Sequence, residues 1–494
     1  MPPDHISVTF LGTAAGKPSQ TRNVSSLVVK LDSRLWVFDA GEGTQHQFMD
    51  PLCKLQMSKV TKIFVTHMHA DHVNGLPGLL CTISAGEGSV LPGTEDPRVE
   101  EAKELPPTQI YGPSGLRLFL RTTLGLTHSI LTRPYAVHEL LFPDERTCTQ
   151  DEGALHPSER AGRDIRMGAE GDWRGFVDEK EGAGVQVSAA PIEHTIRCIG
   201  YLLHESARPL PMVPSSYIPH LKRPINAAAL AAQGVKNPLS LLSRLQSERE
   251  PIELADGTVL RPPELGGEGG RRVVVLGDTF DAETGMGPLL DSPFTSSASF
   301  ASSSSSDAAQ PSIPSPSHAD YVDLAIHEST NAFLPTLDDS HSPLKPLPAS
   351  LQSVTALARS HGHSTPQVAG SFARRARARR LVMNHLSVKY PDPESARLAP
   401  GEGVGGASEE TRGRWRGMLS EMERQAGRAM RGEAFEPEPA ADEVAGAGGG
   451  QEGGGEEWTV RTARDFWEVE VPRRDKAAAA KTEGKGGKKG MGKT

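Results

Sequence analysis

The sequence predicts a layered α/β protein, and three observations support this fold class. Short runs rich in β-branched and aromatic residues alternate with helix-like segments, as in domains where helices cover a sheet. Residues capable of chemistry directly follow several of these runs, at the points where the strands of such a sheet end. The 37% hydrophobic residues and the 51 glycines together reach the ordinary globular range, so the chain can bury a sizeable core.

The expected elements follow one another along most of the chain. An apolar run predicts a helix over 116–126, and Ser364, Thr365 and Pro366 form the start signal of another helix. A further amphipathic helix is expected over 411–431. Apolar runs that end in turn-forming residues predict strands over 6–11, 27–31, 35–38, 63–66, 109–111, 185–191, 199–203, 273–276, 322–326, 381–383 and 465–471.

Composition divides the chain into a main domain and additions to it. We expect one domain over residues 1–400, interrupted by flexible inserts at 84–107, 144–184 and 291–318. The first two inserts are acidic, and the third is low-complexity sequence that contains a run of five serines. Residues 401–494, rich in Gly and charged side chains, are expected to form a C-terminal extension that is largely disordered.

The formal net charge of −9 taken alone argues against an anionic partner such as RNA. The acidic residues are concentrated, however, with eight of them and no basic residue in 433–457 and an acidic excess in the first two inserts. Residues 206–249 carry six Lys or Arg against one acid, and residues 359–389 carry seven against none. The charge distribution therefore favours an anionic partner, although the total does not.

Other broad features restrict the cellular setting. The four cysteines show no CxxC spacing, which argues against a disulfide framework and against a cysteine-based zinc site. No run approaches 18 consecutive apolar residues, so no membrane span and no membrane partner are expected. Strand-like sequence from residue 6 leaves no room for a targeting peptide. We expect a protein of the nucleus, the cytoplasm or both.

One loop carries the strongest chemical signal. His67, His69, Asp71 and His72 follow the strand expected at 63–66, so three imidazoles and a carboxylate can face one point. Imidazole suits zinc, and four donors exceed what one tetrahedral ion with an open position requires. A pair of metal ions is the natural interpretation. The alternative is a surface loop that happens to be rich in histidine.

Three further candidates each follow a strand-like run: His194, Asp278 and His385. Taken alone, each is more often a core or surface residue than a ligand. Their position at strand ends, in a chain that also contains the metal loop, reverses that expectation. Together with the loop they supply five histidines and two aspartates, enough for two sites bridged by one carboxylate.

The motifs resemble the metallo-β-lactamase superfamily and, within it, the short form of ribonuclease Z, the tRNA 3′-processing endonucleases. The resemblance covers residues 6–390 discontinuously and leaves the inserts and the C-terminal hundred residues unmatched. Its motifs, in chain order, are Phe10-Leu11-Gly12-Thr13, Lys17-Pro18, Thr21-Arg22-Asn23-Val24-Ser25-Ser26, Phe38-Asp39-Ala40-Gly41-Glu42-Gly43-Thr44-Gln45, the metal loop with Asn74-Gly75-Leu76-Pro77-Gly78-Leu79-Leu80, Glu193-His194, Gly200-Tyr201, Leu276-Gly277-Asp278-Thr279, His327-Glu328-Ser329-Thr330, His363-Ser364-Thr365 and Asn384-His385-Leu386-Ser387.

The resemblance implies a fold and an activity. The fold is the metallo-β-lactamase-type four-layer αβ/βα sandwich with a protruding basic arm, here at 206–265, and low-complexity inserts. The activity is that of a zinc-dependent endoribonuclease, with two zinc ions per subunit. Such an enzyme removes the 3′ trailer from precursor tRNA and leaves a 3′-hydroxyl on the tRNA and a 5′-phosphate on the trailer. Short-form relatives act as homodimers, so that the arm of one subunit presents tRNA to the other.

The resemblance also implies roles for single residues. One zinc is assigned to His67, His69 and His194, and the other to Asp71, His72 and His385. Asp278 bridges the two ions, and Asp71 also serves as general base. The catalytic set is completed by His363 beside the leaving group, oriented by Glu328. Substrate contacts are expected from Arg22 and Asn23 in a phosphate-facing loop and from Lys222, Arg223 and Lys236 in the arm.

Two other functions remain open from the sequence. A hydrolase of small phosphodiesters or sulfate esters shares the metal ligands but does not need a basic arm. A catalytically weak RNA-binding partner keeps the fold, although seven intact ligand positions count against it. At the level of residues, His363 has the alternative of a plain histidine before a helix, and the arm that of an ordinary solvated loop.

Overall fold

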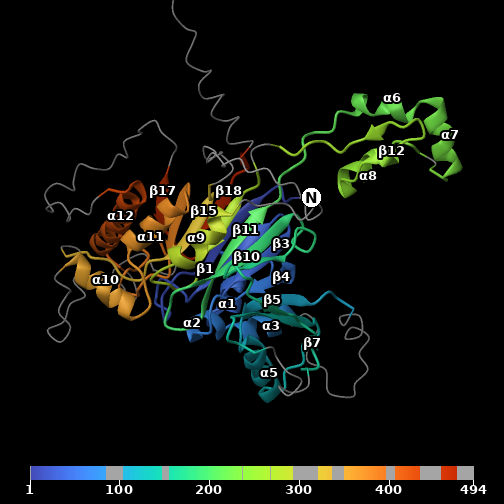
Figure 1. Cartoon of the computed structure of the whole chain (residues 1–494). Helices are drawn as coiled ribbons and strands as arrows, with labels where there is room; N and C mark the ends of the chain where they lie inside the picture. The colour runs from blue at the N-terminus through green and yellow to red at the C-terminus, as the bar shows by residue number, and fades with distance from the viewer. Residues whose placement is uncertain are drawn as a thin grey trace, which may run out of the picture.

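Two β-sheets pack face to face, and helices cover the outer face of each (Figure 1). The computed structural model describes residues 2–84, 104–146, 155–235, 237–266, 269–292, 321–335, 350–395, 407–433 and 458–474. The first sheet has the order β18 (Glu468–Val471), β1 (Ile6–Gly12), β2 (Ser26–Leu31), β3 (Arg34–Phe38), β4 (Val60–Phe64), β5 (Thr108–Pro113), β6 (Tyr135–Leu141) and β7 (Glu159–Arg160), with β8 (Asp164–Arg166) also pairing with β6. The second has the order β17 (Thr459–Thr462), β16 (Arg380–Asn384), β15 (Leu324–Glu328), β14 (Arg272–Val275), β11 (Cys198–Glu205), β10 (Val185–Ile192) and β9 (Trp173–Val177).

The helices complete four layers, αβ/βα. Apolar side chains on the outside of the first sheet pack against α1 (Thr44–Met49), α3 (Leu76–Ser84) and α5 (Leu116–Leu126). Those on the outside of the second pack against α9 (Glu283–Asp291), α11 (Pro366–Arg375) and α12 (Glu409–Arg431). The other described helices of the sandwich are η1 (Met57–Lys59), α2 (Ala70–Val73) and α10 (Leu351–Ser360). None of the described helices is long and apolar enough to cross a membrane.

Aromatic side chains fill the space between the two sheets. The ring of Phe64 stacks on the rings of Phe38 and Tyr111, with centroid distances of 4.7 and 5.2 Å. The ring of Tyr201 from the second sheet meets Phe64 edge-on, with a centroid distance of 5.4 Å. The Tyr201 hydroxyl donates a hydrogen bond of 2.6 Å to the Val65 carbonyl. The two sheets are therefore tied together directly beneath the loop that carries the histidines.

Parallel pairing directs several strands toward one edge. β3, β4, β5 and β6 are parallel to one another in the first sheet, and β14, β15 and β16 are parallel in the second. The carboxyl ends of such strands lie at a common edge, where ligands bind in open α/β sheets. The histidine loop follows β4, Asp278 follows β14 and His385 follows β16, so this edge gathers the candidate site.

The C-terminal segment belongs to both sheets. β17 pairs in parallel with β16, and β18 pairs antiparallel with β1, so each sheet ends on a strand from residues 458–474. Helix α12 packs closely on α11, where a side chain at Gly370 would collide with the Ala426 carbonyl. The expectation that the main domain ends near residue 400 is therefore wrong. The helix over 411–431 and the strand ending at residue 471 lie where the sequence places them.

The expected insert at 144–184 also belongs largely to the sheets. Residues 155–184 contain β7, β8 and β9, and Trp173 of β9 is 1% exposed in the core between the sheets. The acidic composition of this segment concealed these strands, although Trp173, Phe176 and Val177 of β9 are themselves buried in the core. The inserts expected at 84–107 and 291–318 lie almost entirely outside the described residues, as do residues 147–154.

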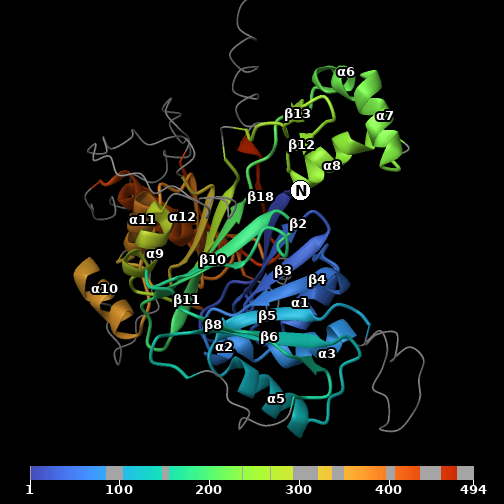
Figure 2. The same ribbon diagram turned by 45° about the vertical axis from the view of Figure 1, so that its right-hand side comes forward.

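The residues between β11 and β14 form an arm that projects from the sandwich (Figures 1 and 2). It contains η3 (Pro214–Ser216), α6 (Ile218–Leu221), α7 (Pro224–Ala232), α8 (Ser240–Glu248) and a hairpin of β12 (Ile252–Glu253) and β13 (Val259–Leu260). It has an apolar core of its own, formed by Leu221, Leu230, Leu241, Leu245, Leu254 and Leu260.

Buried ionic contacts hold the base of the arm. The Arg271 guanidinium donates to both carboxylate oxygens of Glu205, at 2.7 and 2.8 Å, and also to the carbonyls of Pro3 and Val471. Both charged side chains are almost fully buried. The contact thus joins the two ends of the arm to the N-terminal segment and to β18.

We predict that a chain ending at residue 457 does not fold cooperatively. It lacks β17 and β18, so both sheets lose their edge strands, and buried Arg22 loses the Ala463 carbonyl that it contacts. Each buried polar group left without a partner costs about 1–3 kcal/mol, which is large against a typical stability of about 5–15 kcal/mol. Thermal unfolding followed by circular dichroism measures the effect. A chain ending at residue 474, which retains every described strand, is the control; equal midpoints for the two chains would contradict the prediction.

Candidate metal centre

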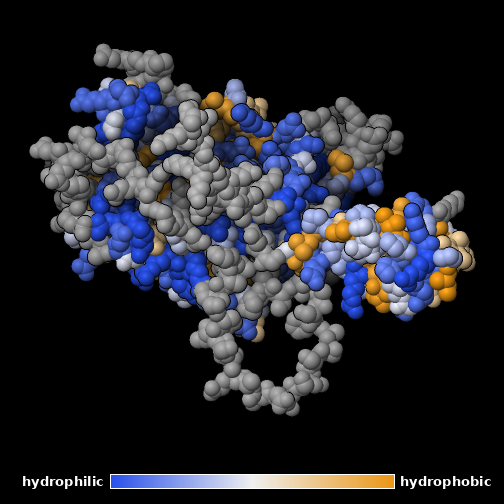
Figure 3. Space-filling view, turned by 90° about the horizontal axis from the view of Figure 1, so that it is seen from above, coloured by the Kyte–Doolittle hydropathy of each residue, from blue (hydrophilic) through white to orange (hydrophobic). Residues whose placement is uncertain are grey.

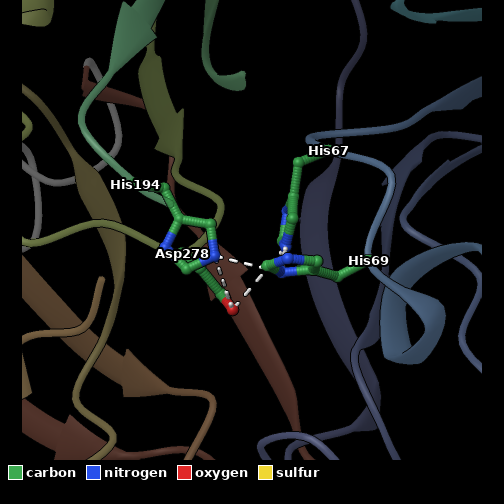
Figure 4. Close-up of side chains that lie close together, drawn as sticks. All are labelled: His67, His69, His194 and Asp278. Atoms are coloured by element: carbon green, nitrogen blue, oxygen red, sulfur yellow. Dashed lines mark hydrogen bonds and ion pairs between the residues drawn. The ribbon is translucent and has the colours of Figure 1, made fainter. Parts of the chain in front are cut away.

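The edge of the sandwich gathers the side chains of all seven expected ligands. One group of mutually close ligand atoms contains His67, His69, His194 and Asp278 (Figure 4). The second group contains Asp71, His72 and His385. Residues more than 300 positions apart in the chain thus lie in one cluster, because the strands that precede them end at the same edge.

The first group surrounds one point. His67 Nε2 lies 3.0 Å from His69 Nδ1, and His194 Nε2 lies 3.1 Å from the same atom. An oxygen of Asp278 lies 3.7 Å from His67 Nε2 and 3.9 Å from His194 Nε2. Four donors held at about 2.0–2.2 Å from a tetrahedral ion are roughly 3.4 Å apart, so this group fits zinc.

The second group adjoins the first through Asp278. His385 Nε2 lies 3.2 Å from both His72 Nε2 and an Asp71 oxygen. The other oxygen of Asp278 lies 3.4 Å from His72 Nε2. Asp278 is 2% exposed and offers one carboxylate oxygen to each group, which is the arrangement a bridging ligand requires.

The electrostatics of the cluster also suit metal ions. Burial lowers the pKa values of His67, His69 and His194, so these imidazoles are neutral at physiological pH, as metal ligation requires. Burial acts to raise the pKa of Asp278, but nearby His385 and His72 hold it well below its ordinary range. Nitrogen lone pairs facing one another at about 3 Å repel unless a cation lies between them. The residues therefore fit zinc by their geometry, and His67, His69 and His194 fit it by their protonation as well.

Asp39 organises both groups, and it is absent from the expected site residues. Its carboxylate accepts hydrogen bonds from His72 Nδ1 at 2.7 Å, from the Thr66 hydroxyl at 2.8 Å and from the Thr66 amide at 2.7 Å. The Thr66 oxygen in turn lies 3.0 Å from His67 Nδ1. Asp39 thus fixes, directly or through Thr66, one histidine of each group with its Nε2 lone pair facing the centre. Its position directly after a strand was the available signal.

Glu328 has the same function on the second sheet. One carboxylate oxygen accepts from His363 Nδ1 at 3.2 Å and from the backbone amides of Thr279 and Ser364, and the other accepts from the Thr330 amide and hydroxyl. Burial acts to lower the pKa of His363, but its contact with Glu328 raises it to about 9. Glu328 is therefore a positioning residue that holds His363 beside Asp278, 3.8 Å away.

A glycine allows the His363 segment to approach the metal ligands. His194 Nδ1 donates a 2.7 Å hydrogen bond to the Gly362 carbonyl, which leaves Nε2 facing the first group. Gly362 has φ of +82°, and a Cβ atom there would collide with His194 Nδ1. Any other residue is therefore strained at this position and displaces a candidate ligand.

The expected substrate contact of Arg22 is wrong. The side chain is 0% exposed and points inward, where Nε donates to the Tyr390 carbonyl at 3.0 Å and Nη1 donates to the Thr13 hydroxyl and the Ala463 carbonyl. Arg22 thus joins its loop to the C-terminal segment. Asn23 is half-buried beside it and donates from its amide group to the Glu42 carbonyl at 3.0 Å.

The arm residues are only in part as expected. Lys222 and Arg223 are exposed, but Arg223 forms an ion pair of 2.7 Å with Asp256. Lys236 lies outside the described residues. The whole segment 206–265 carries seven Lys or Arg and five Asp or Glu, so it is less basic than its first two thirds. Apolar side chains also gather on its surface (Figure 3): Leu210, Val213, Ile225, Leu239, Val259 and Leu265.

The four-layer sandwich and the two His/Asp groups at one of its edges define a zinc metallohydrolase of the metallo-β-lactamase fold. Known proteins identify the family. The chain is 33% identical to zinc phosphodiesterase ELAC protein 1 of Mus musculus, over 81% of this chain and 91% of that protein. It is 30% identical to ribonuclease BN of Proteus mirabilis, over 80% of this chain and 93% of that protein.

The chain therefore belongs to the ribonuclease Z family, which includes these proteins. Residues 6–85 match the family described as Anti-Pycsar protein Apyc1, and this range contains the histidine loop. Among solved structures, human tRNase Z, short form, aligns at 24% identity over 94% of this chain and 99% of that chain, with a TM-score of 0.46.

We predict that Asp39→Asn lowers zinc affinity about 10- to 100-fold. The amide cannot accept from both Thr66 and His72 as the carboxylate does, so one histidine of each group loses its fixed orientation. Competition with a chromogenic chelator measures the affinity. Asp32→Asn is the matched control, because Asp32 has a φ of 53°, close to the 56° of Asp39, but lies in an exposed turn. Equal affinities for the two variants would show that Asp39 does not support the metal ligands.

Proposed function

We propose that this chain is a zinc-dependent endoribonuclease that removes the 3′ trailer from precursor tRNA. The observation that carries the proposal is the convergence of five histidines and two aspartates into two adjoining groups, in a member of the ribonuclease Z family. The products are a tRNA with a 3′-hydroxyl and a trailer with a 5′-phosphate. We propose two zinc ions per subunit: His67, His69 and His194 would hold one, Asp71, His72 and His385 would hold the other, and Asp278 would contribute to both.

Zinc, when bound, lowers the pKa of water toward neutrality and offsets the negative charge that develops on the phosphoryl oxygens. The chain supplies the proton acceptor. Asp71 is held in place by the Gly16 amide, which donates to Oδ2 at 2.7 Å, and by His385. Its carboxylate is partly open to solvent, so it can orient a water molecule toward phosphorus and take the proton that the water loses.

His363 supplies a proton on the other side of the reaction. Its Nδ1 is engaged by Glu328, so Nε2 is the atom that can donate to the leaving oxygen as the bond between phosphorus and that oxygen breaks. Helix α11 begins three residues later with Pro366 at its first turn, and the positive end of its dipole favours a phosphate nearby. The scissile phosphate thus lies between an acceptor on the first sheet and a donor on the second.

The arm and the basic residues favour RNA over a small ester. The arm projects beyond the sandwich, where a small substrate would not reach it (Figure 2). Arg359, four residues before His363, is exposed and adds positive charge there, whereas the exposed Arg374 and Arg377 lie at the other end of α11. Phosphate contacts of this kind make binding strongly dependent on salt. We further propose that the chain acts as a homodimer, with the arm of one subunit presenting tRNA to the other.

Cleavage of an end-labelled precursor tRNA tests the proposal. We expect one cut at the 3′ end of the tRNA, abolished by a chelator and restored by zinc. His363→Ala should slow this cut by about 10²- to 10⁴-fold, while elemental analysis still finds two zinc ions per chain. His361→Ala, in the exposed neighbouring histidine, is the control and should cleave at the rate of the unmodified chain. Loss of metal from His363→Ala would instead make His363 a ligand, and no cut by the unmodified chain would refute the proposal.

We predict that removing the arm separates RNA cleavage from small-ester hydrolysis. β11 and β14 are antiparallel neighbours in which His204 pairs with Arg272, so an Asn-Gly turn can replace residues 207–269 and close a hairpin. The shortened chain should lose most precursor-tRNA cleavage, yet hydrolyse bis(p-nitrophenyl) phosphate at the rate of the full chain. Equal loss of both activities would show that the arm supports the fold and does not bind RNA.

A further inference from the structure

A cavity of about 390 Å³ lies beside the His363 segment, between α9, α10 and α11. Backbone hydrogen bonds link the segments that line the cavity to segments of the metal centre. The Phe280 amide donates to the carbonyl of Glu193, the neighbour of His194, at 3.0 Å. Arg359 lies four residues before His363. The carbonyl of Ala358, which precedes Arg359, accepts a hydrogen bond of 2.9 Å from the His363 amide. These contacts connect the walls of the cavity to the segments that carry His194 and His363.

One wall is a flat platform. The Arg359 guanidinium lies over the Phe280 ring, 4.7 Å from its centroid, and Arg359 is exposed whereas Phe280 is half-buried. RNA bases unstacked from their neighbours bind to aromatic rings and to arginine guanidinium planes. Phe280 lies two residues after Asp278, and Arg359 lies four residues before His363.

The floor of the cavity offers hydrogen-bond acceptors. Burial lowers the pKa of His327, so its ring is neutral, and its Nδ1 donates to the Glu328 carbonyl at 2.7 Å. Its Nε2 is therefore an acceptor. The Gln367 amide nitrogen donates to Gln425 at 2.8 Å, so its Oε1 is also an acceptor. Both acceptor atoms are buried and have no partner among the described residues.

The charges around the cavity indicate which part of a nucleotide it takes. Asp281 and Glu283 line the cavity together with a single cation, Arg359, so the net negative charge of the lining disfavours a phosphate. The Asp281 carboxylate already accepts from the Glu283 and Thr284 amides. A planar, neutral group with donors on its edge matches the platform and the acceptors, which describes a nucleobase with an exocyclic amino group.

We propose that this cavity binds a base of the RNA substrate, from a nucleotide next to the scissile phosphate, stacked on Phe280 and Arg359. The two acceptors favour adenine, cytosine or guanine, which each carry an amino group with two hydrogens, over uracil, whose base offers only the N3–H. The inference rests on the proposed endoribonuclease function and adds a base preference to it. The nucleotide belongs either to the tRNA side or to the trailer side of the cut, and the experiment distinguishes these.

The test uses the zinc-loaded full chain and precursor tRNAs in which each of the four bases is placed at the nucleotide before the cut or at the nucleotide after it. We expect kcat/KM to fall for uracil at one of these positions and not at the other. A second readout does not depend on catalysis: 2-aminopurine at the preferred position, in a precursor made resistant to cleavage, should lose fluorescence on binding because its base becomes stacked.

Phe280→Ala should weaken binding of the precursor by about 5- to 150-fold, remove the base preference and abolish the fluorescence change. Phe280→Trp keeps an aromatic face and should restore all three, which separates stacking from a loss of fold. Arg359→Lys keeps the charge without the plane, and we expect it to behave as Arg359→Ala does.

Four results would contradict the inference. Cleavage of precursor tRNA without a base preference at either position refutes the base site and leaves the proposed function standing. A loss of 2-aminopurine fluorescence on binding to Phe280→Ala that equals the loss on binding to the unmodified chain does the same. Arg359→Lys behaving as the unmodified chain shows that only charge matters there. Failure of the unmodified chain to cleave any precursor tRNA refutes the proposed function and the base site together.

Discussion

Two buried carboxylates hold the site together, one on each sheet. Asp39 fixes a histidine of each metal group, and Glu328 joins the segments that follow β14 and β15 to His363. Each carboxylate accepts hydrogen bonds from several donors, which compensates for the cost of burying its charge. The Tyr201 hydroxyl, which donates to the Val65 carbonyl directly below the site, connects the sheets that carry its two halves.

A buried ionic contact also explains how one chain combines a rigid centre with a projecting arm. The arm leaves the second sheet at a buried Glu205–Arg271 pair, which also contacts the N-terminal segment and β18. Breaking a buried pair by removing one partner costs about 3–5 kcal/mol, so the base of the arm is fixed even though the arm has a core of its own. The C-terminal strands contribute to this base as well as to both sheets, and are therefore part of the nuclease fold.

Most strands and the helices over α5, α11 and α12 could be predicted, because apolar periodicity and capping signals act over a few residues. β7, β8 and β9 could not, because β7 and β8 are only two and three residues long and the segment that contains all three strands is acidic. Arg22 shows the same limit at the level of one side chain. The motif that contains Arg22 predicts a phosphate contact. The carbonyls of Tyr390 and Ala463, more than 360 positions away, instead hold the Arg22 side chain in the protein interior.

The sequence by itself determined the kind of chemistry: a loop with three histidines and an aspartate, and three more candidates placed after strands, predict a metal site, because these side chains are typical zinc ligands. Only the tertiary structure decided how those donors are oriented, which residues hold them and which cavity adjoins them. Asp39, Glu328 and the Phe280–Arg359 platform depend on contacts between distant segments. Such contacts leave no periodicity in the sequence, since they form only when two sheets meet at one edge.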